Sequence, residues 1–489
     1  MNRALIAIAL LIVFVGGVSP SVFSAEPSTR PPNIVFILAD DLGYAELGCF
    51  GQTKIKTPNI DRLAAEGMKL TQHYAGNAVC APSRCVLMTG MHPGHATIRN
   101  NREHKPEGQQ PMHAADVTLA ELLKTRGYTT GAFGKWGLGF PGSEGDALNQ
   151  GFDHFYGYNC QRHAHSIYPA YLWDDDQRVT LNNNPPVPGH AKFPKDADPN
   201  DPAAYARFKG TDYAPDRINT AALDFIRRNK DNPFYCYYPT VIPHLALQVP
   251  DDELAPYLGK WPETPAIKAA YTPHQTPRAA YAAFISHLDA NVGRVLDLLD
   301  TLGLTDNTIV VFTSDNGATY LREVDYEFFQ SVGPLRGLKG SLYEGGVRVP
   351  AIVRWPGHVK PGSSSDFVSG FEDWLPTLAQ IVGIKTPDNV DGISLVPTLT
   401  GKSQPARDFL YREFSGYGGQ QSVRVGDWKA IRQQLRKGKV VTELYNLADD
   451  IAEQHDLAAD HPDRVKTLEA IMRREHTASQ LFPLQTIDP

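Results

Sequence analysis

The pentapeptide Cys80-Ala81-Pro82-Ser83-Arg84 combines residue types that suit chemistry on a bound anion. Pro82 favours the first position of a helix, where its missing N–H costs nothing, so the sequence predicts that Cys80 lies at the start of a helix that continues to Thr89. The free N–H groups at such a helix start favour an oxyanion and lower the pKa of a thiol, and Arg84 adds a planar cation. The alternative is a buried or disulfide-bonded cysteine in an ordinary turn.

Two pairs of polar residues follow predicted strands and could bind a metal ion. Asp40-Asp41 follows the apolar run of residues 33–39, and Asp315-Asn316 follows the apolar run of residues 308–314. Carboxylate and amide oxygens without a neighbouring His or Cys suit Ca²⁺ or Mg²⁺ better than zinc. The alternative is that both pairs only form turns after strands.

An alternation of apolar strand patterns and amphipathic helix patterns predicts the elements that position these residues. The order indicates an α/β fold with a large, mostly parallel sheet covered by helices on both faces. Ligands bind at the carboxyl ends of the strands in such sheets, so we expect six residues to meet at one edge: Asp40, Asp41, Lys135, His244, Asp315 and Asn316. The predicted strands span residues 33–39, 128–133, 234–238, 308–314 and 349–355, and the predicted helices span residues 57–67, 116–126, 214–229, 279–302 and 371–382.

The length of the chain, 489 residues, indicates a large domain with a smaller companion. We assign residues 26–400 to the large domain and residues 401–489 to a C-terminal α+β unit. In this unit, antiparallel strand patterns at 422–432 and 440–445 precede a helix pattern at 462–476. Residues 141–213 lack periodicity, which is common in functional or mobile segments.

The N-terminal residues 1–25 have the order of a secretory signal peptide: Arg3, an apolar run, and then small residues. The apolar run is shorter than the roughly 20 residues of a membrane span, so we expect export to the periplasm or the medium, with an uncleaved anchor as the lesser alternative. Removing this segment leaves 46 basic and 54 acidic residues, a net charge of −8. This mild acidity argues against nucleic acid as a partner.

The Cys80 to Arg84 pentapeptide resembles the signature of type I, formylglycine-dependent sulfatases of the alkaline-phosphatase-like superfamily. Further segments resemble this family in the same chain order, so the likeness covers nearly the whole chain after the leader: Asp40-Asp41, Gly134-Lys135-Trp136, Pro243-His244-Leu245, Asp315-Asn316 and Gly337-Leu338-Lys339-Gly340. The resemblance implies that a formylglycine-generating enzyme converts Cys80 to 3-oxoalanine. It also implies Ca²⁺, in preference to Mg²⁺, bound by residue 80 with the side chains of Asp40, Asp41, Asp315 and Asn316.

The resemblance implies a covalent mechanism. Hydrated formylglycine at position 80, positioned by Arg84, attacks the sulfur atom of a sulfate ester. Lys135 and Lys339 bind the sulfate, and His244 or Lys339 protonates the leaving alcohol. The second hydroxyl of the hydrate then allows the sulfated intermediate to collapse to the aldehyde and free sulfate.

The chain has five cysteines, at positions 49, 80, 85, 160 and 236, and no Cys-x-x-Cys pair. An odd number is unexpected in an oxidising compartment. Conversion of Cys80 would leave four cysteines, which allow three disulfide pairings. A zinc or iron–sulfur site built from cysteines is not expected.

One residue departs from the family pattern. The usual Gly-Lys-Trp-His-Leu-Gly is here Gly134-Lys135-Trp136-Gly137-Leu138-Gly139, so the histidine that assists the final collapse is absent. Glycine cannot move protons, so another group must act in its place or that step is slow. His163 and His165 are candidates for a replacement base or for substrate contacts, and the alternative is that both only belong to a surface loop.

The segment after the Cys80 helix includes His95, Arg99 and Asn100, and we expect it to border the pocket and bind substrate. Aromatic residues of the loop could stack on a sugar ring, or could only pack the loop: Tyr158, Tyr168 and Trp173. These features resemble bacterial arylsulfatase-type polysaccharide sulfatases, which favours a sulfated carbohydrate over an aryl sulfate. The competing hypotheses are a phosphodiesterase or phosphonate monoester hydrolase, and a noncatalytic glycan-binding protein if Cys80 stays unmodified.

Overall fold

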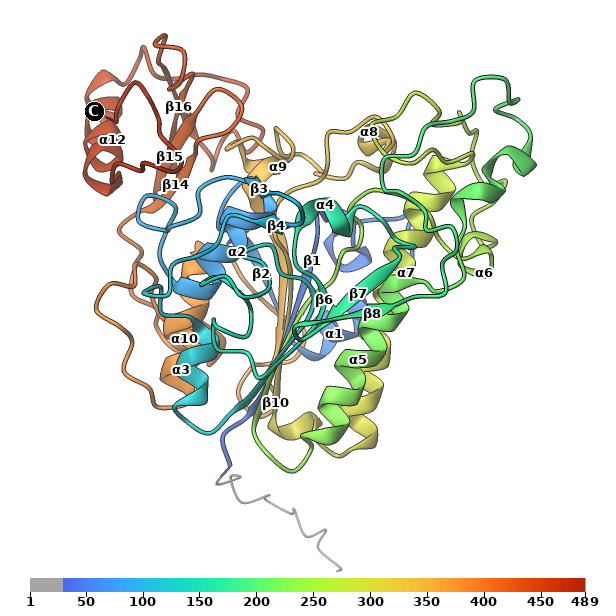
Figure 1. The fold of residues 1–489 in the computed structure, drawn as a ribbon. Helices are drawn as coiled ribbons and strands as arrows, with labels where there is room; N and C mark the ends of the chain where they lie inside the picture. Colours follow the sequence, from blue (N-terminus) through green and yellow to red (C-terminus); the bar gives the residue numbers. More distant parts are fainter. Residues whose placement is uncertain (1–29, 489) are drawn as a thin grey trace, which may run out of the picture.

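The computed structural model describes residues 30–488, so the predicted signal peptide lies outside the described residues. Figure 1 shows a large sheet between two layers of helices, with a small C-terminal unit above one side. No helix within residues 30–488 is long and apolar enough to cross a bilayer. All five cysteines are free thiols, so the expected disulfides are absent from this structure.

The centre of the main sheet is parallel, as predicted. β1 (Asn33–Ala39) pairs in parallel with β10 (Thr308–Ser314) on one side and with β9 (Phe234–Pro239) on the other, followed by β5 (Thr129–Lys135) and β6 (His154–Tyr158). Antiparallel strands lie at both sides of this centre, among them β11 (Arg348–Arg354), which pairs antiparallel with β10. The remaining strands of this sheet are β2 (Met68–Tyr74), β7 (Tyr171–Asp174), β8 (Gln177–Thr180), β12 (Ser363–Ser365) and β13 (Ser369–Gly370). The order across the eleven-stranded sheet is β12-β2-β11-β10-β1-β9-β5-β6-β7-β8, with β13 beside β2.

Alternate residues of β1 enter two separate cores, because successive side chains of a strand point to opposite faces. Val35 and Ile37 pack with α1 (Pro58–Glu66), α5 (Ala214–Arg228) and α7 (Pro277–Thr301). Ile34, Phe36 and Leu38 pack on the other face with α2 (Cys80–Thr89), α3 (Leu119–Lys124) and α10 (Trp374–Ile381). Burial on both faces explains the continuous apolar run of this strand.

Two predicted helix starts are corrected by the structure. α2 begins at Cys80 itself, so Pro82 is its third residue and not its first. α3 begins at Leu119 because Thr118 is its N-cap: the Thr118 hydroxyl accepts from the Glu121 N–H, and the Glu121 carboxylate accepts from the Thr118 N–H. This capping box excludes residues 116–118 from the helix.

Residues 141–213 are more ordered than the sequence indicates. They contain β6, α4 (Gln161–Ala164), β7 (Tyr171–Asp174), β8 (Gln177–Thr180) and the 3₁₀ helix η2 (Pro202–Phe208). The buried Asn183 side chain connects distant parts of this loop, since its amide donates to the carbonyls of Pro169 and Asp212. Hydrogen bonds made by single side chains do not recur at a fixed spacing along the chain, so the hydrophobic periodicity of the sequence does not reveal them.

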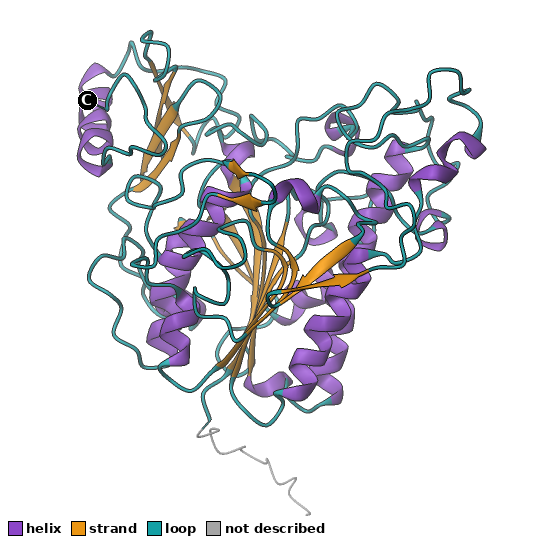
Figure 2. Ribbon diagram, in the orientation of Figure 1, coloured by secondary structure: helices purple, strands orange, loops and turns teal. Residues whose placement is uncertain are grey.

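The C-terminal unit is a four-stranded antiparallel sheet with one helix (Figure 2). The sequence predicts its last three strands and the helix but misses β14. A buried ion pair joins the unit to the main domain, with Arg412 Nη2 of β14 at 2.9 Å from Glu372 Oε2. The boundary near residue 400 stays a prediction. The elements of this unit are β14 (Leu410–Phe414), β15 (Gln420–Val425), β16 (Trp428–Gln433), β17 (Val441–Asn446) and α12 (Pro462–Glu475).

The remaining strands are β3 (Glu103–His104) and β4 (Gly108–Gln109). The remaining helices are η1 (Gly48–Phe50), α6 (Asp251–Leu254), η3 (Thr305–Asn307), α8 (Tyr326–Phe329), α9 (Glu344–Val347), η4 (Phe371–Asp373) and α11 (Val396–Leu399).

Candidate active site

The carboxyl ends of four neighbouring strands bring the predicted polar residues together. Asp40 and Asp41 follow β1, Asp315 and Asn316 follow β10, Lys135 ends β5, and His244 follows β9. These strands are hydrogen-bonded neighbours and run parallel, so residues far apart in the sequence meet at one edge. The start of α2 brings Cys80 to the same edge, where its Sγ lies 3.5 Å from Asp40 Oδ1.

A buried cluster of oxygen atoms lies next to the thiol. One oxygen each of Asp40, Asp41 and Asp315 lies within 4.8 Å of the others and of Cys80 Sγ. Asn316 Nδ2 donates to Asp41 Oδ1 at 2.8 Å, whereas Asn316 Oδ1 is buried without a partner among the described residues. Three carboxylates and an unused amide oxygen form the hard donor set that Ca²⁺ and Mg²⁺ prefer, so these residues fit such an ion.

Two lysines flank the thiol of Cys80. Lys135 Nζ lies 3.4 Å from Cys80 Sγ and 2.7 Å from Asp40 Oδ2. Lys339 Nζ lies 3.6 Å from Cys80 Sγ and 2.7 Å from Asp41 Oδ1. Arg84 Nη2 binds Asp315 Oδ2 at 2.8 Å, and its Nη1 donates to the Lys135 carbonyl. The two lysines can therefore gather the oxygens of an anionic group, whereas Arg84 holds Asp315 and the end of β5 in place.

The thiol itself is not acidified, contrary to the sequence prediction. Burial raises the pKa of Cys80 to about 12, and the nearby Lys135 and Lys339 offset only part of this effect. Arg84 is occupied by Asp315 and does not bind the thiol. An unmodified Cys80 is therefore a protonated thiol at neutral pH and a poor nucleophile.

The ionisation of the other groups follows from burial and from their neighbours. Burial and the adjacent Asp40 raise the pKa of Asp315 to about 6. Burial opposes ionisation of Asp40 as well, but Lys135 and His244 hold the pKa of Asp40 well below its usual range. Burial and Lys339 lower the pKa of His244 to about 4. His244 Nδ1 donates to the Leu245 carbonyl at 2.7 Å, so its Nε2 is the nitrogen that faces Asp41.

A cavity of about 310 Å³ opens above Cys80 and contains charged, neutral polar and aromatic groups. Its floor includes Cys80, Lys339 and His244, and its wall includes His165, one of the two predicted candidates for a replacement base or a substrate contact. Other lining residues are Val79, Asn101, Glu103, Gln109, Gln161, Arg162, Tyr271, Thr319, Tyr320, Leu321 and Tyr417. This mixture suits a polar molecule that carries one anionic group.

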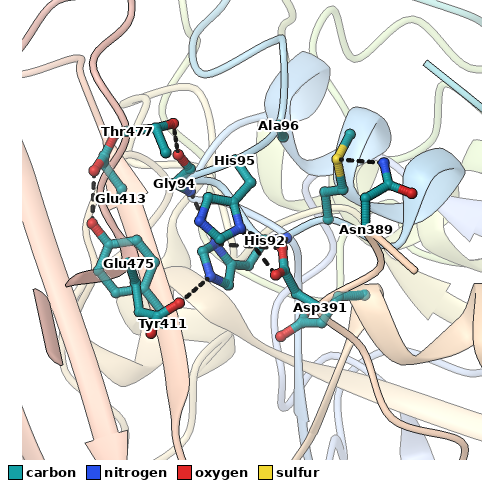
Figure 3. Close-up of polar contacts among 12 residues, drawn as sticks. His92, Gly94, His95, Ala96, Asn389, Asp391, Tyr411, Glu413, Glu475 and Thr477 are labelled. Atoms are coloured by element: carbon teal, nitrogen blue, oxygen red, sulfur yellow. Dashed lines mark hydrogen bonds and ion pairs between the residues drawn. The ribbon is translucent and has the colours of Figure 1, made fainter. Parts of the chain in front are cut away.

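The structure places His95 and Arg99 away from the cavity, which corrects the expected position of this segment. His95 Nδ1 binds Asp391 at 2.9 Å and its ring stacks on His92, as Figure 3 shows. Arg99 Nη1 lies 3.1 Å from Glu413 of β14. His95 thus bonds within the main domain, whereas Arg99 joins the main domain to the C-terminal unit.

Asn100 and His163 also do not line the cavity. The Asn100 side chain accepts from the N–H of Asn101 at 2.8 Å, and Asn101 is the residue that lines the cavity. His163 Nδ1 lies 3.1 Å from Glu107 Oε1. The position of His163 therefore gives no support to a role as replacement base or substrate contact. His165 lines the cavity and remains a candidate for both roles.

The aromatic residues of the loop pack inside the protein. Tyr158, Tyr168 and Trp173 are buried, so these rings pack the loop against the protein and do not offer a face to a sugar ring. The aromatic rings at the cavity mouth are instead Tyr320 and Tyr417, which are 44% and 63% exposed, with their hydroxyls 3.0 Å apart. Sequence analysis missed both, although Gly416-Tyr417-Gly418-Gly419 is a turn signal that could have drawn attention to an exposed ring.

Comparison with known protein families decides the identity of this site. The family model described as Sulfatase matches residues 32–384, and a model described as N-sulphoglucosamine sulphohydrolase, C-terminal, matches residues 338–479. The chain belongs to the sulfatase family. The sulfatase is therefore an enzyme, and family membership overrides the hypothesis of a noncatalytic glycan-binding protein.

Curated relatives and solved structures agree with this assignment. The sulfatase is 35% identical to human arylsulfatase A over 82% of this chain and 75% of the relative. It is 29% identical to an N-acetylgalactosamine-6-O-sulfatase of Bacteroides thetaiotaomicron over 92% of this chain and 94% of the relative. Its fold matches the crystal structure of Ps i-CgsB in complex with k-i-k-neocarrahexaose, with a TM-score of 0.73 and 26% identity over 91% of this chain and 92% of that chain.

Proposed function

We propose that this sulfatase hydrolyses the sulfate ester of a sulfated carbohydrate. The observation that carries the proposal is the position of Cys80 at the floor of the cavity, where its Sγ lies 3.4 Å from Lys135 Nζ and 3.6 Å from Lys339 Nζ. A sulfate ester is anionic and repels nucleophiles, so fixed cations must neutralise its oxygens before attack. The two lysines are suited to bind those oxygens around residue 80.

A divalent cation completes this proposal. Asp40, Asp41, Asp315 and Asn316 would hold it, and Ca²⁺ is preferred to Mg²⁺ because flexible carboxylate and amide oxygens suit the larger ion. The unpartnered Asn316 Oδ1 supports the assignment, since a buried carbonyl oxygen without a partner is costly unless a ligand uses it. Bound there, the ion supplies Lewis-acid polarisation of the sulfate oxygens.

The nucleophile in this proposal is formylglycine, formed from Cys80 by a formylglycine-generating enzyme. As its hydrate, it supplies one hydroxyl group that attacks sulfur and a second hydroxyl group that lets the sulfated intermediate collapse to the aldehyde and free sulfate. Arg84 fixes the start of α2 by binding Asp315 and the Lys135 carbonyl, and so keeps position 80 aimed at the cavity. Lys339 Nζ delivers the proton that the leaving alcohol requires, because a neutral His244 carries its proton on Nδ1, which donates to the Leu245 carbonyl.

A carbohydrate rather than an aryl group is proposed on two grounds. The wall of the cavity carries several neutral polar side chains, among them Asn101, Gln109 and Gln161, which suit hydroxyl groups better than an aromatic ring. One relative, from Bacteroides thetaiotaomicron, is an N-acetylgalactosamine-6-O-sulfatase, and Ps i-CgsB, a protein of similar fold, was crystallised in complex with k-i-k-neocarrahexaose. The predicted leader agrees with action in the periplasm or outside the cell.

Peptide mass analysis of residue 80 in active protein tests the nucleophile. We expect the aldehyde, and an unmodified thiol in an active preparation from the natural host would overturn the proposal. Matched assays with N-acetylgalactosamine 6-sulfate, para-nitrophenyl sulfate and para-nitrophenyl phosphate test the reaction class. Sulfate esters should be cleaved and the phosphate ester only weakly, whereas a preference for phosphate would indicate a phosphoesterase.

A further inference from the structure

The space next to Gly137 is filled by a side chain from another segment. Gly137 has a φ of +79°, in the left-handed region that disfavours side chains. A Cβ atom at this position would lie 2.5 Å from Nε2 of Gln161, which is closer than real carbon atoms approach. Gln161 therefore occupies the space that a side chain at position 137 would need, and the two side chains cannot coexist without a shift.

The amide of Gln161 has no partner of its own. Gln161 is 7% exposed and lines the cavity together with Cys80 and His165. Both Nε2 and Oε1 are buried and lack a hydrogen bond to any residue within 30–488. Buried amides are almost always hydrogen-bonded, because an unsatisfied donor and acceptor cost free energy. The amide is thus available for a ligand that supplies one acceptor and one donor.

The surroundings of Gln161 indicate what that ligand is. The cations that suit sulfate, Lys135 and Lys339, lie next to Cys80, whereas the lining of the same cavity also includes the neutral amides of Asn101 and Gln109. A side-chain amide does not ionise near neutral pH, so Gln161 cannot act as a general acid or base. A neutral group that both donates and accepts is suited to a hydroxyl or an acetamido group.

We propose that the Gln161 amide binds a hydroxyl or acetamido group of the sugar ring beside the sulfate ester, and thereby determines specificity for carbohydrate over aryl sulfates. This inference rests on the proposed carbohydrate substrate. The Nε2 group donates to an oxygen of the ring substituent, and Oε1 accepts its O–H or N–H. An aryl sulfate offers neither contact, and a pocket built around a buried amide discriminates strongly against such a ligand.

Kinetics of Gln161→Leu on two substrates test the proposal. The ratio of kcat/KM for a sulfated saccharide to kcat/KM for para-nitrophenyl sulfate should fall at least tenfold, because only the saccharide loses hydrogen bonds. The saccharide is the one that wild-type enzyme cleaves fastest among sulfated galactose, N-acetylgalactosamine and N-acetylglucosamine. Gln177→Leu, on the exposed strand β8, is the matched control and should leave the ratio unchanged. Gln161→Ala, with a smaller side chain, repeats the test if the leucine variant does not fold.

Binding to protein that cannot react gives a second readout. In a Cys80→Ala background, calorimetry with the same saccharide should show a Kd at least tenfold higher after Gln161→Leu. An unchanged Kd, or equal losses of kcat/KM on both substrates, would overturn the role of Gln161 and leave the proposed reaction intact. Wild-type enzyme that cleaves para-nitrophenyl sulfate and none of the three sulfated sugars would instead overturn the proposed substrate class, and this inference with it.

Discussion

The imidazole rings of His165 and His244 stack face to face at the cavity wall, with centroids 5.0 Å apart and planes 4° apart. A chain of hydrogen bonds determines the tautomer of His165. His190 Nδ1 donates to the Ala270 carbonyl at 2.9 Å, so His190 Nε2 is left to accept from His165 Nδ1 at 2.8 Å. The unprotonated nitrogen of a neutral His165 is therefore Nε2, which makes it a candidate proton acceptor.

His165→Ala should lower kcat by roughly 10²-fold, the usual contribution of a positioned general base. Loss of the base should slow the final collapse more than the attack, so rapid-mixing experiments should show a burst of released alcohol that is larger than in wild type. His163→Ala is the control, because His163 is paired with Glu107 away from the cavity. Wild-type turnover in His165→Ala would rule out a catalytic role for this residue.

Arg99→Ala should destabilise the protein and leave KM unchanged. The buried Arg99 bonds Glu413 and also donates to the Thr477 carbonyl at 2.6 Å, so its loss removes one of the two basic partners of the buried Glu413, the other being His476. We expect the free energy of unfolding to fall by about 3 kcal/mol in urea titrations. Arg102→Ala, at an exposed position, is the control and should change the free energy of unfolding by less than about 0.5 kcal/mol. A raised KM with normal stability would instead restore Arg99 as a substrate contact.

Gly137→His should not recover the family's usual catalysis. The left-handed backbone costs about 1–2 kcal/mol for a side chain, and overlap with Gln161 costs about 1–3 kcal/mol more. Thermal unfolding of Gly137→His should therefore show a clear loss of stability. The double variant Gly137→His with Gln161→Gly removes the overlap and should regain part of the loss. If the changes in stability of the two single variants add up to the change in the double variant, the two side chains do not compete for space.

The stability of the protein should fall below neutral pH through His73. Burial lowers the pKa of His73 to about 3, and both ring nitrogens are used: Trp374 Nε1 lies 3.2 Å from Nε2, and Ser369 Oγ lies 2.9 Å from Nδ1. The unfolded chain binds a proton near pH 6.5 that the folded chain rejects, so stability is lost as pH falls from about 6.5 toward 3.

The contribution of His73 can be measured by urea unfolding at two pH values. Between about pH 7 and 5, wild type should lose about 2 kcal/mol more than His73→Phe, which cannot titrate. Three other histidines, His165, His244 and His274, also have lowered pKa values, so the difference between wild type and His73→Phe isolates the contribution of His73. If the free energy of unfolding falls equally with pH in wild type and in His73→Phe, then His73 does not cause the loss of stability.

Calcium should stabilise the protein through the acidic cluster. Addition of Ca²⁺ at about 100-fold its Kd should raise the free energy of unfolding by about 2.7 kcal/mol, visible as a higher Tm. Asp41→Asn should abolish this shift, whereas Asp306→Asn on the surface should keep it. Measuring Tm in a Cys80→Ala background separates ion binding from turnover. An equal shift in the Asp41→Asn variant would place the ion elsewhere.

Local sequence patterns determined the strands of the sheet and the edge at which the site lies. β10 spans the predicted residues 308–314, because a strand buried on both faces must be apolar throughout. The same argument placed Asp40 and Asp315 after neighbouring strands. Individual boundaries depended on side-chain bonds such as the Thr118 capping box, which the helical period does not show.

The sequence by itself determined the family, the sheet and the set of charged groups at its carboxyl edge, because these follow from motifs and from the period of apolar residues. Only the tertiary structure decided that His165 faces the cavity and that Arg99 does not, since these positions depend on how the chain turns between elements. It also showed that Gln161 fills the space beside Gly137, a contact between side chains that local sequence does not encode.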